Sequence, residues 1–314
     1  MPMSGRFTKV IAAVMSAMLL ASCSDWPSGL KPAEIYETPE TTAVVTEAPA
    51  TPTPIPTPTE KPVPKFPEFE PDYKSAAPAL GYKTRSLTFF RDGNPITGRI
   101  TYPEGEGPFK TIIISNGLYA GFGRYAAFAQ RFSTYGYAVI EYQYQNGTAP
   151  SPYHDPDWLG DFIYEQVLDL YAVMDSMRFF PEVDLSNIYL YGHSMGGLVT
   201  SFAGTMRQDE VKGLILVDPS FYAAQFMDFE YEQTITTEIY PLITKCNIPV
   251  VIITGTAGSF GEDPHCFDEA VEAFPDCEVV VIEGANHRMD GDASYKVVSR
   301  SVSVMKKWDE RAGN

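Results

Sequence analysis

The sequence predicts an α/β fold, in which a mostly parallel central sheet of about eight strands is flanked by helices on both faces. Continuous β-branched runs such as "KTIIIS" (110–115) and "PVVIITG" (249–255) are typical of strands buried on both faces. Segments with helical spacing of apolar residues stand between these runs, as parallel strands require. The polar residues that could carry chemistry directly follow predicted strands, and chemistry in such sheets lies at the carboxyl ends of the strands.

The predicted elements follow one another along the chain. "SLTFF" (86–90) and "GRITYP" (98–103) flank the turn-rich "RDGNPITG" and form an antiparallel opening pair. The six further strands are predicted at residues 110–115, 137–142, 187–192, 213–218, 249–255 and 278–284. Helices are predicted at 123–135, 161–177, 198–206, 267–274 and 293–309, and residues 143–160 form an irregular loop. No internal repeat or second core is visible, so residues 76–314 are one predicted domain.

The composition excludes some partners. The chain has 314 residues, 44% of them hydrophobic and 13% aromatic, which suits a globular domain with a sizeable core. Its formal net charge of −17 disfavours nucleic acid as a partner, because phosphates would be repelled.

The N-terminus has the features of a targeting segment. Arg6 and Lys9 precede the apolar run "VIAAVMSAMLL", which is too short to span a bilayer as a stable helix. "LASC", which ends at Cys23, follows directly and resembles the lipobox of bacterial lipoproteins. That resemblance implies a signal peptide over residues 1–22, lipidation of Cys23 and attachment to the bacterial cell membrane on its outer side. An ordinary secretory signal with an incidental cysteine is the alternative.

A stalk is predicted between the membrane and the domain. Residues 23–75 are rich in Pro, Thr and Glu and have no apolar period, so they cannot bury enough surface to form a core. Alternating Thr-Pro favours an extended, semi-rigid spacer, and a leader without a spacing role is the alternative. In an exported chain a disulfide between Cys246 and Cys277 is the first choice, with three free thiols, Cys266 included, as the alternative.

"YGHSMGGL" (191–198) presents Ser194 as a candidate nucleophile. The motif Gly-x-Ser-x-Gly follows a predicted strand and precedes a predicted helix, which is the setting in which a serine adopts a strained, exposed turn. A serine needs a base, and His287 follows the last predicted strand, from which it can reach over the sheet edge to Ser194. His193 lies next to the serine and is badly aimed, and loop roles are expected for His154 and His265.

The base needs a carboxylate to fix its tautomer and to offset the imidazolium charge. In the chain order Ser…Asp/Glu…His that acid lies between Ser194 and His287. Asp263, after the strand at 249–255, is the first choice, and Asp218 and Glu262 are the alternatives.

Acyl transfer also requires two donors for the developing oxyanion. One is the backbone N–H of Met195, and the other comes from the loop "SNGLYAGFGRY", where Leu118 is the first choice and Tyr119 the next. Tyr119, Phe221 and Phe226 are candidate pocket residues, although the phenylalanines could equally be ordinary packing residues.

With these residues assembled, the chain resembles the α/β-hydrolase superfamily across about residues 85–310. The resemblance rests on "IIISNGLYAGFGRYAAFAQRFSTYGYAVIEY", "NIYLYGHSMGGL", "IPVVIITG" and "EGANH", in that order. It implies serine esterase, lipase or related acyl-hydrolase chemistry without a metal or cofactor. Most members have His-Gly where this chain has Asn116-Gly117, and their Gly-x-x-Asp is stretched here to Gly255…Asp263.

The leading hypothesis is a lipid-anchored, extracytoplasmic serine hydrolase that cleaves carboxylic esters. Acetyl, feruloyl and other short acyl esters on exposed polysaccharide suit a domain held outside the cell. The alternatives are a lipase of the monoacylglycerol-lipase type, a peptidase with the same triad, and a non-catalytic surface-binding module that keeps the fold.

Overall fold

The computed structural model describes residues 81–148, 158–221 and 235–312, and side chains 158–160 are not among those described. The predicted signal peptide, Cys23, the stalk, His154 and Phe226 all lie outside these residues. Within them, no helix is both long and apolar enough to cross a bilayer.

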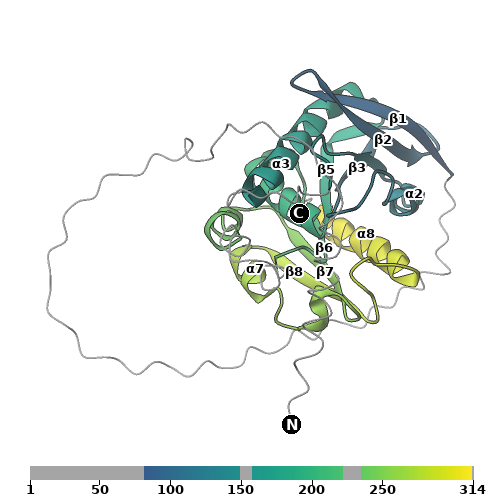
Figure 1. The fold of residues 1–314 in the computed structure, drawn as a ribbon. Helices are drawn as coiled ribbons and strands as arrows, with labels where there is room; N and C mark the ends of the chain where they lie inside the picture. Colours follow the sequence, from purple (N-terminus) through teal and green to yellow (C-terminus); the bar gives the residue numbers. More distant parts are fainter. Residues whose placement is uncertain (1–80, 149–157, 222–234, 313–314) are drawn as a thin grey trace, which may run out of the picture.

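One eight-stranded sheet runs through the domain (Figure 1). Its strands are β1 (Tyr82–Arg91), β2 (Asn94–Pro103), β3 (Phe109–Ser115), β4 (Ala138–Tyr142), β5 (Val183–His193), β6 (Leu214–Val217), β7 (Val250–Gly255) and β8 (Cys277–Ile282). Their order across the sheet is β1-β2-β4-β3-β5-β6-β7-β8. The pairs β1–β2 and β2–β4 are antiparallel, and every pair from β4 to β8 is parallel.

The opening hairpin is tighter than the sequence analysis predicted. Arg91 pairs with Asn94, so only Asp92 and Gly93 form the turn. Both have positive φ, 52° and 79°, which is the backbone of the two-residue turn whose twist matches that of the flanking strands. "DG" between alternating apolar residues is the signal for this turn, and the surrounding Arg, Asn and Pro obscured it.

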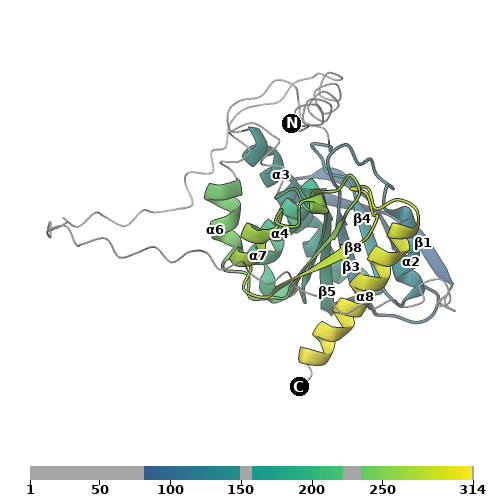
Figure 2. The same cartoon turned by 90° about the horizontal axis from the view of Figure 1, so that it is seen from below.

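Helices cover both faces of the sheet (Figure 2). They are α2 (Ala126–Thr134), α3 (Trp158–Ser176), α4 (Met195–Met206), α6 (Tyr240–Ile243), α7 (Asp268–Ala273) and α8 (Asp292–Ala312), with the single turns η2 (Met177–Phe179), η3 (Gln208–Glu210), η5 (Ile235–Ile239) and η6 (Phe260–Glu262). The pair η5 and α6 was not predicted from the sequence, whereas the five longer helices match predicted segments.

Each face of the sheet has its own apolar core. On one face, α2 and α8 pack against alternate side chains of the central strands, among them Ile112, Tyr191 and Val251. On the other, α3, α4, α6 and α7 pack against the intervening side chains, such as Ile113, Leu190 and Ile252. The continuous β-branched runs are explained by this arrangement, because side chains on both sides of each central strand are buried.

The predicted cysteine pair is absent. Cys246, Cys266 and Cys277 are free thiols. Sγ of Cys246 lies 3.7 Å from the carbonyl oxygen of Ile248, and Sγ of Cys277 lies 3.9 Å from that of Glu278. Each of these two sulfur atoms contacts a backbone carbonyl close to it in sequence. The structure therefore agrees with the alternative of three free thiols and not with the predicted pair.

Candidate active site

Ser194 occupies a sharp turn between β5 and α4. Its φ of 55° and ψ of −123° are strained for a residue with a side chain. The turn needs glycine at both flanks: a Cβ on Gly192 would lie 2.2 Å from the carbonyl oxygen of Gly196, and one on Gly196 would lie 2.3 Å from that of Ser115. The close approach of strand, helix and neighbouring loop therefore explains the spacing of the Gly-x-Ser-x-Gly motif.

His287 reaches Ser194 from the loop after β8. Its Nε2 atom lies 3.1 Å from Oγ of Ser194. The backbone N–H of His287 donates to the carbonyl of Gly258 at 3.2 Å, which attaches the loop to the one after β7. The two residues predicted as nucleophile and base are thus in hydrogen-bond contact although they are 93 positions apart.

The carboxylate against His287 is Asp218, the residue after β6. Its Oδ2 atom lies 2.5 Å from Nδ1 of His287, and its side chain is fully buried. Its Oδ1 accepts hydrogen bonds from the hydroxyls of Thr254 at 2.5 Å and Ser259 at 2.7 Å, and the Phe260 N–H donates to Oδ2 at 3.3 Å. Both oxygens of this buried carboxylate therefore have hydrogen-bond donors.

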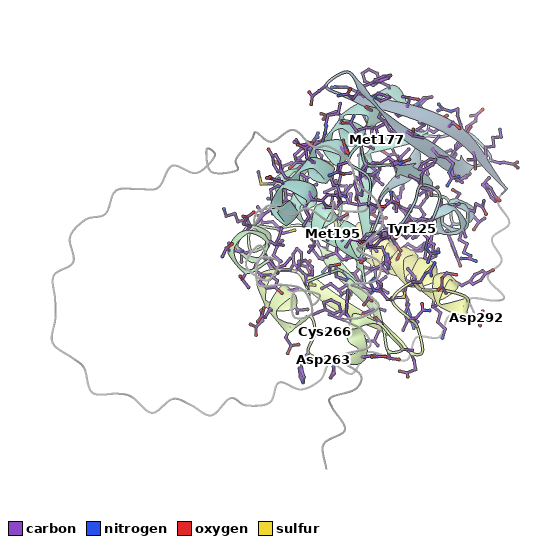
Figure 3. The ribbon with its side chains drawn as sticks, in the orientation of Figure 1. Tyr125, Met177, Met195, Asp263, Cys266 and Asp292 are labelled. Atoms are coloured by element: carbon purple, nitrogen blue, oxygen red, sulfur yellow. The ribbon has the colours of Figure 1, made fainter. Side chains whose placement is uncertain are left out.

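Asp263, the first choice of the sequence analysis, occupies a different place. It follows η6, where its Oδ1 accepts the backbone N–H of His265 at 2.9 Å. The single proton of Nδ1 on His287 is directed to Asp218, so that atom has none for Asp263. In Figure 3 Asp263 lies at the edge of the domain, away from Met195 beside the serine. Glu262, the other alternative, accepts the backbone N–H of Gly258 within its own loop.

The contacts determine the tautomer of His287. A carboxylate only accepts hydrogen bonds, so Nδ1 carries the proton and donates to Asp218. Nε2 is then the acceptor for the hydroxyl of Ser194. This is the arrangement in which the imidazole can take the serine proton.

The two predicted oxyanion donors lie beside the elbow. Met195 is the first residue of α4, and the first N–H groups of a helix have no partner within it. Gly117 packs so closely on the elbow that a Cβ there would lie 3.0 Å from Cβ of Ser194, which brings Leu118 next to the nucleophile. The backbone N–H of Tyr119, the alternative donor, is instead bonded to the carbonyl of Thr148 at 2.8 Å.

Asn116 anchors the loop at residues 115–125, here called the oxyanion loop after its predicted role, at the position where the sequence analysis noted Asn-Gly in place of His-Gly. Its buried side-chain amide donates to the carbonyl of Tyr142 at 2.7 Å. Tyr144 donates from its hydroxyl to the carbonyl of Asn116 at 3.3 Å. The side chain therefore ties the loop to the end of β4, and the backbone donor of the next residues is unaffected by its identity.

The predicted pocket residues differ in exposure. Tyr119 is 46% exposed and has a positive φ of 56°, so it stands at the surface of the oxyanion loop. Phe221 is 2% exposed and packs against the rings of Tyr240 and Phe274, at centroid distances of 5.9 Å and 6.2 Å. Phe221 is thus a core residue, which corresponds to the packing alternative.

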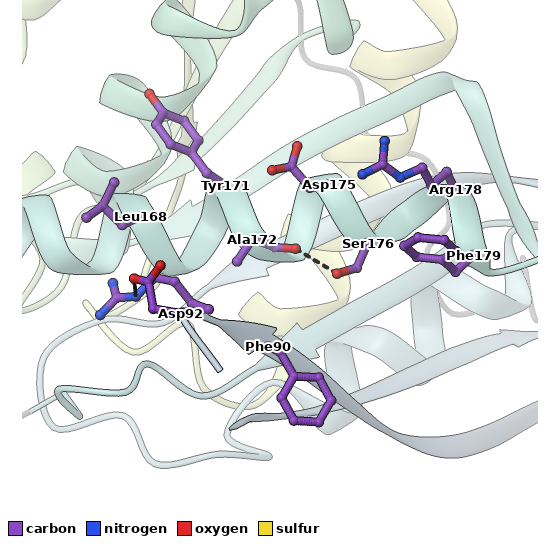
Figure 4. Close-up of a pocket in the computed structure, with 10 residues that line it drawn as sticks. Phe90, Asp92, Leu168, Tyr171, Ala172, Asp175, Ser176, Arg178 and Phe179 are labelled. Carbon is purple, nitrogen blue, oxygen red and sulfur yellow. Dashed lines mark hydrogen bonds and ion pairs between the residues drawn. The ribbon is translucent and has the colours of Figure 1, made fainter. Parts of the chain in front are cut away.

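A cavity of about 430 Å³ lies elsewhere, where the β1–β2 hairpin meets α3 and η2 (Figure 4). Phe90, Tyr171, Asp175 and Phe179 are among its lining residues. It contains none of the residues around Ser194. Among the described side chains, no three His, Cys, Asp or Glu are grouped so that they could hold a metal ion.

Several residues of the site escaped the sequence analysis. Besides Thr254 and Ser259, which hold Asp218, the hydroxyl of Ser220 lies 3.3 Å from that of Ser194. These three hydroxyl residues belong to no catalytic motif that the sequence shows. Backbone strain also marks the site: of the five non-glycine residues with positive φ in the described chain, all but Asp92 flank it, namely Tyr119, Ser194, Asp218 and Met289. His265 is exposed, and its ring contacts Asp268 on α7, in agreement with the loop role expected for it.

A family model described as serine aminopeptidase S33 matches residues 106–245. No curated protein sequence matches the chain significantly. Many solved structures do match in fold. Est1E from Butyrivibrio proteoclasticus with bound ferulic acid has 18% identity and a TM-score of 0.54, over 69% of this chain and 98% of that one.

Two further structures illustrate the range of similar proteins. A putative dienelactone hydrolase from Klebsiella pneumoniae subsp. pneumoniae MGH 78578 has 16% identity and a TM-score of 0.57, over 72% of this chain and 99% of that one. Proline iminopeptidase from Mycobacterium smegmatis has 14% identity and a TM-score of 0.54, over 73% of this chain and 100% of that one. The fold of this chain is that of the α/β-hydrolases.

Proposed function

We propose that this chain is a serine hydrolase that cleaves carboxylic esters through Ser194, His287 and Asp218. One observation carries the proposal: an unbroken line of hydrogen bonds runs from the buried carboxylate of Asp218 through the imidazole to the hydroxyl at the strained elbow. A strand-to-helix turn without a chemical role would need neither the buried charge nor the strain.

The geometry supports a two-step acyl transfer. Oγ of Ser194 attacks the acyl carbon while its proton moves to Nε2 of His287, and Asp218 stabilises the imidazolium that forms. The tetrahedral intermediate expels the alcohol, which takes the proton from Nε2 and leaves an acyl-serine. Water then attacks the acyl-serine, gives its proton to Nε2, and the carboxylic acid departs as Ser194 recovers the proton. The N–H groups of Met195 and Leu118 stabilise the oxyanion in both steps.

The substrate class we propose is a short acyl ester, acetyl or feruloyl, carried on polysaccharide outside the cell. Two observations favour it: the fold is similar to that of Est1E with bound ferulic acid, and the N-terminal sequence has the order of a lipoprotein signal followed by a Pro/Thr-rich stalk. The same features lead us to propose that Cys23 is lipidated. A Cys23→Ser chain expressed in a bacterial host should then fail to incorporate labelled palmitate.

An aminopeptidase is the second candidate, because the matching family model bears that description and proline iminopeptidase is among the similar structures. The proposed triad can cleave amides as well as esters. To separate the two candidates, kcat/KM is measured for two esters, ethyl ferulate and p-nitrophenyl acetate, and for two amides, prolyl and alanyl p-nitroanilide. Higher values for the esters favour an esterase, and higher values for the amides favour an aminopeptidase. Longer p-nitrophenyl acyl chains test for a lipase.

The deciding experiment compares the full chain with its Ser194→Ala variant in hydrolysis of p-nitrophenyl acetate and butyrate. We expect kcat to fall by about 10³-fold or more in Ser194→Ala. Ser303→Ala, which removes a hydroxyl bonded only within α8 at 3.0 Å from the Ser299 carbonyl, is the control. Equal rates in Ser194→Ala and wild type, with equal melting temperatures, would contradict the proposal and favour a non-catalytic surface-binding module.

A further inference from the structure

The imidazole of His193 makes two hydrogen bonds that the proposed reaction does not use. Its Nδ1 atom lies 2.7 Å from the hydroxyl of Tyr125, and its Nε2 atom lies 2.7 Å from the backbone carbonyl of His287. A carbonyl only accepts, so Nε2 carries the proton and Tyr125 donates to Nδ1. Burial lowers the pKa of His193 to about 4, so the ring is neutral in neutral solution.

Tyr125 extends this connection to the oxyanion loop. It immediately precedes α2 at the end of the oxyanion loop and is 3% exposed, and the backbone N–H of Gly117 offsets part of the rise that burial causes in the pKa of its hydroxyl. Gly117 precedes Leu118, the candidate oxyanion donor. Two hydrogen bonds therefore join Tyr125, at the end of the oxyanion loop, to the elbow and to the loop that carries the base.

The rings reinforce the connection. The ring of His193 lies 4.9 Å from that of His287, centroid to centroid, with 38° between the planes. Phe260, whose backbone contacts Asp218, places its ring 4.8 Å from His287 as well. The position of His287 is thus held by contacts to its backbone and to its ring, in addition to its contact with the carboxylate of Asp218.

We propose that Tyr125 and His193 are positioning residues that hold the backbone of His287 and the oxyanion loop in register with Oγ of Ser194. The inference rests on the proposed serine hydrolase function and adds two residues to it. Displacements of about 1 Å in a reacting group can cost about 100-fold in rate. Loss of the pair should therefore lower turnover and leave substrate binding nearly unchanged.

Two substitutions of His193 distinguish the roles of its two ring nitrogens. In His193→Gln the side-chain amide nitrogen takes the place of Nε2 and can still donate to the carbonyl of His287. In His193→Asn the amide nitrogen takes the place of Nδ1, so the donor to that carbonyl is lost. Tyr125→Phe removes one oxygen atom and with it the bond to Nδ1 of His193.

The experiment measures kcat and KM of the full chain with p-nitrophenyl acetate, per active site titrated with a fluorophosphonate. His193→Asn, which loses the donor to the His287 carbonyl, should lower kcat about 10- to 100-fold with KM within about threefold. Tyr125→Phe and His193→Gln, which lose the bond between the two side chains and keep that donor, should lower kcat less, about 3- to 10-fold. Tyr189→Phe is the matched control. It removes another buried tyrosine hydroxyl, which is bonded to Asp309 on α8.

A merely structural role gives a different result. Wild-type kcat per titrated site in Tyr125→Phe and His193→Asn, with only the melting temperature lowered, would overturn the inference. So would equal losses in His193→Gln and His193→Asn. If His193→Asn fails to fold, Tyr125→Phe decides. Failure of the proposed function itself is recognised separately, because Ser194→Ala would then keep wild-type activity.

Discussion

Nδ1 of His287 lies 2.5 Å from Oδ2 of Asp218, a residue that follows β6 rather than β7. The three carboxylates considered from the sequence, Asp263 as the first choice and Asp218 and Glu262 as the alternatives, all follow strands at the same edge of the sheet. Asp218 alone among the three combines full burial, donors from neighbouring strands and loops, and contact with the imidazole. The roles of these residues can be tested individually.

Replacement of Asp218 should be far more harmful than replacement of Asp263. We expect Asp218→Asn to lower kcat/KM by about 10³- to 10⁴-fold, because the neutral amide no longer fixes the tautomer of His287 or stabilises the imidazolium. Asp263→Asn is the matched control and should remain within about threefold of wild type. Ester hydrolysis by the purified chains measures both, and the reverse order of effects would make Asp263 the acid.

The oxyanion loop should not tolerate a side chain at Gly117. A Cβ there would lie 3.0 Å from the carbonyl oxygen of His193 and from Cβ of Ser194, so the loop or the elbow has to shift by a few tenths of an ångström to accommodate it. We expect Gly117→Ala to lower kcat about tenfold or more, through displacement of the Leu118 donor.

Gly121→Ala is the control for that change in the same loop, since a Cβ there has no neighbour within 4 Å among the described residues. It should leave kcat at the wild-type value. If both variants turn over equally fast, the position of this loop does not affect the reaction.

His193 should make stability depend on pH. Burial lowers its pKa from an ordinary value of about 6.5 to about 4, so below pH 6.5 the unfolded chain binds a proton that the folded chain does not. Stability is then greatest above pH 6.5 and is lost as the pH falls. Relative to His193→Gln, wild type should lose about 2 kcal/mol of unfolding free energy between pH 8 and pH 5. Urea unfolding at both pH values measures this, and a difference that does not change with pH would contradict it.

Asp169 should have the opposite effect. It is fully buried on α3, accepts the Gln145 N–H at 2.7 Å and lies 3.1 Å from the guanidinium of Arg91. Burial raises its pKa to about 6, so the folded chain keeps a proton that the unfolded chain releases. Relative to Asp169→Asn, wild type should therefore lose about 1 kcal/mol of unfolding free energy as the pH rises from 5 to 8.

Asp175→Asn, on the exposed side of the same helix, is the control for Asp169→Asn. It should change the free energy of unfolding by less than about 0.5 kcal/mol at either pH. A gain in stability of wild type over Asp169→Asn with rising pH would show that the pKa of Asp169 is not raised.

The sequence by itself determined the α/β class, the eight strands, and the elbow with Ser194 and a histidine after the last strand. These are local patterns: a β-branched run indicates a buried strand, and two glycines around a serine indicate a close strand-to-helix turn. Only the tertiary structure decided which carboxylate meets His287 and that Tyr125 and His193 connect the loops. Asp218 and His287 are 69 positions apart, and their contact depends on the order of strands across the sheet and on the directions of the loops that follow them. The spacing of residues along the chain does not show this order or these directions. Neighbouring strands bring several polar side chains to the same edge of the sheet, and the sequence does not show which of them meets the histidine.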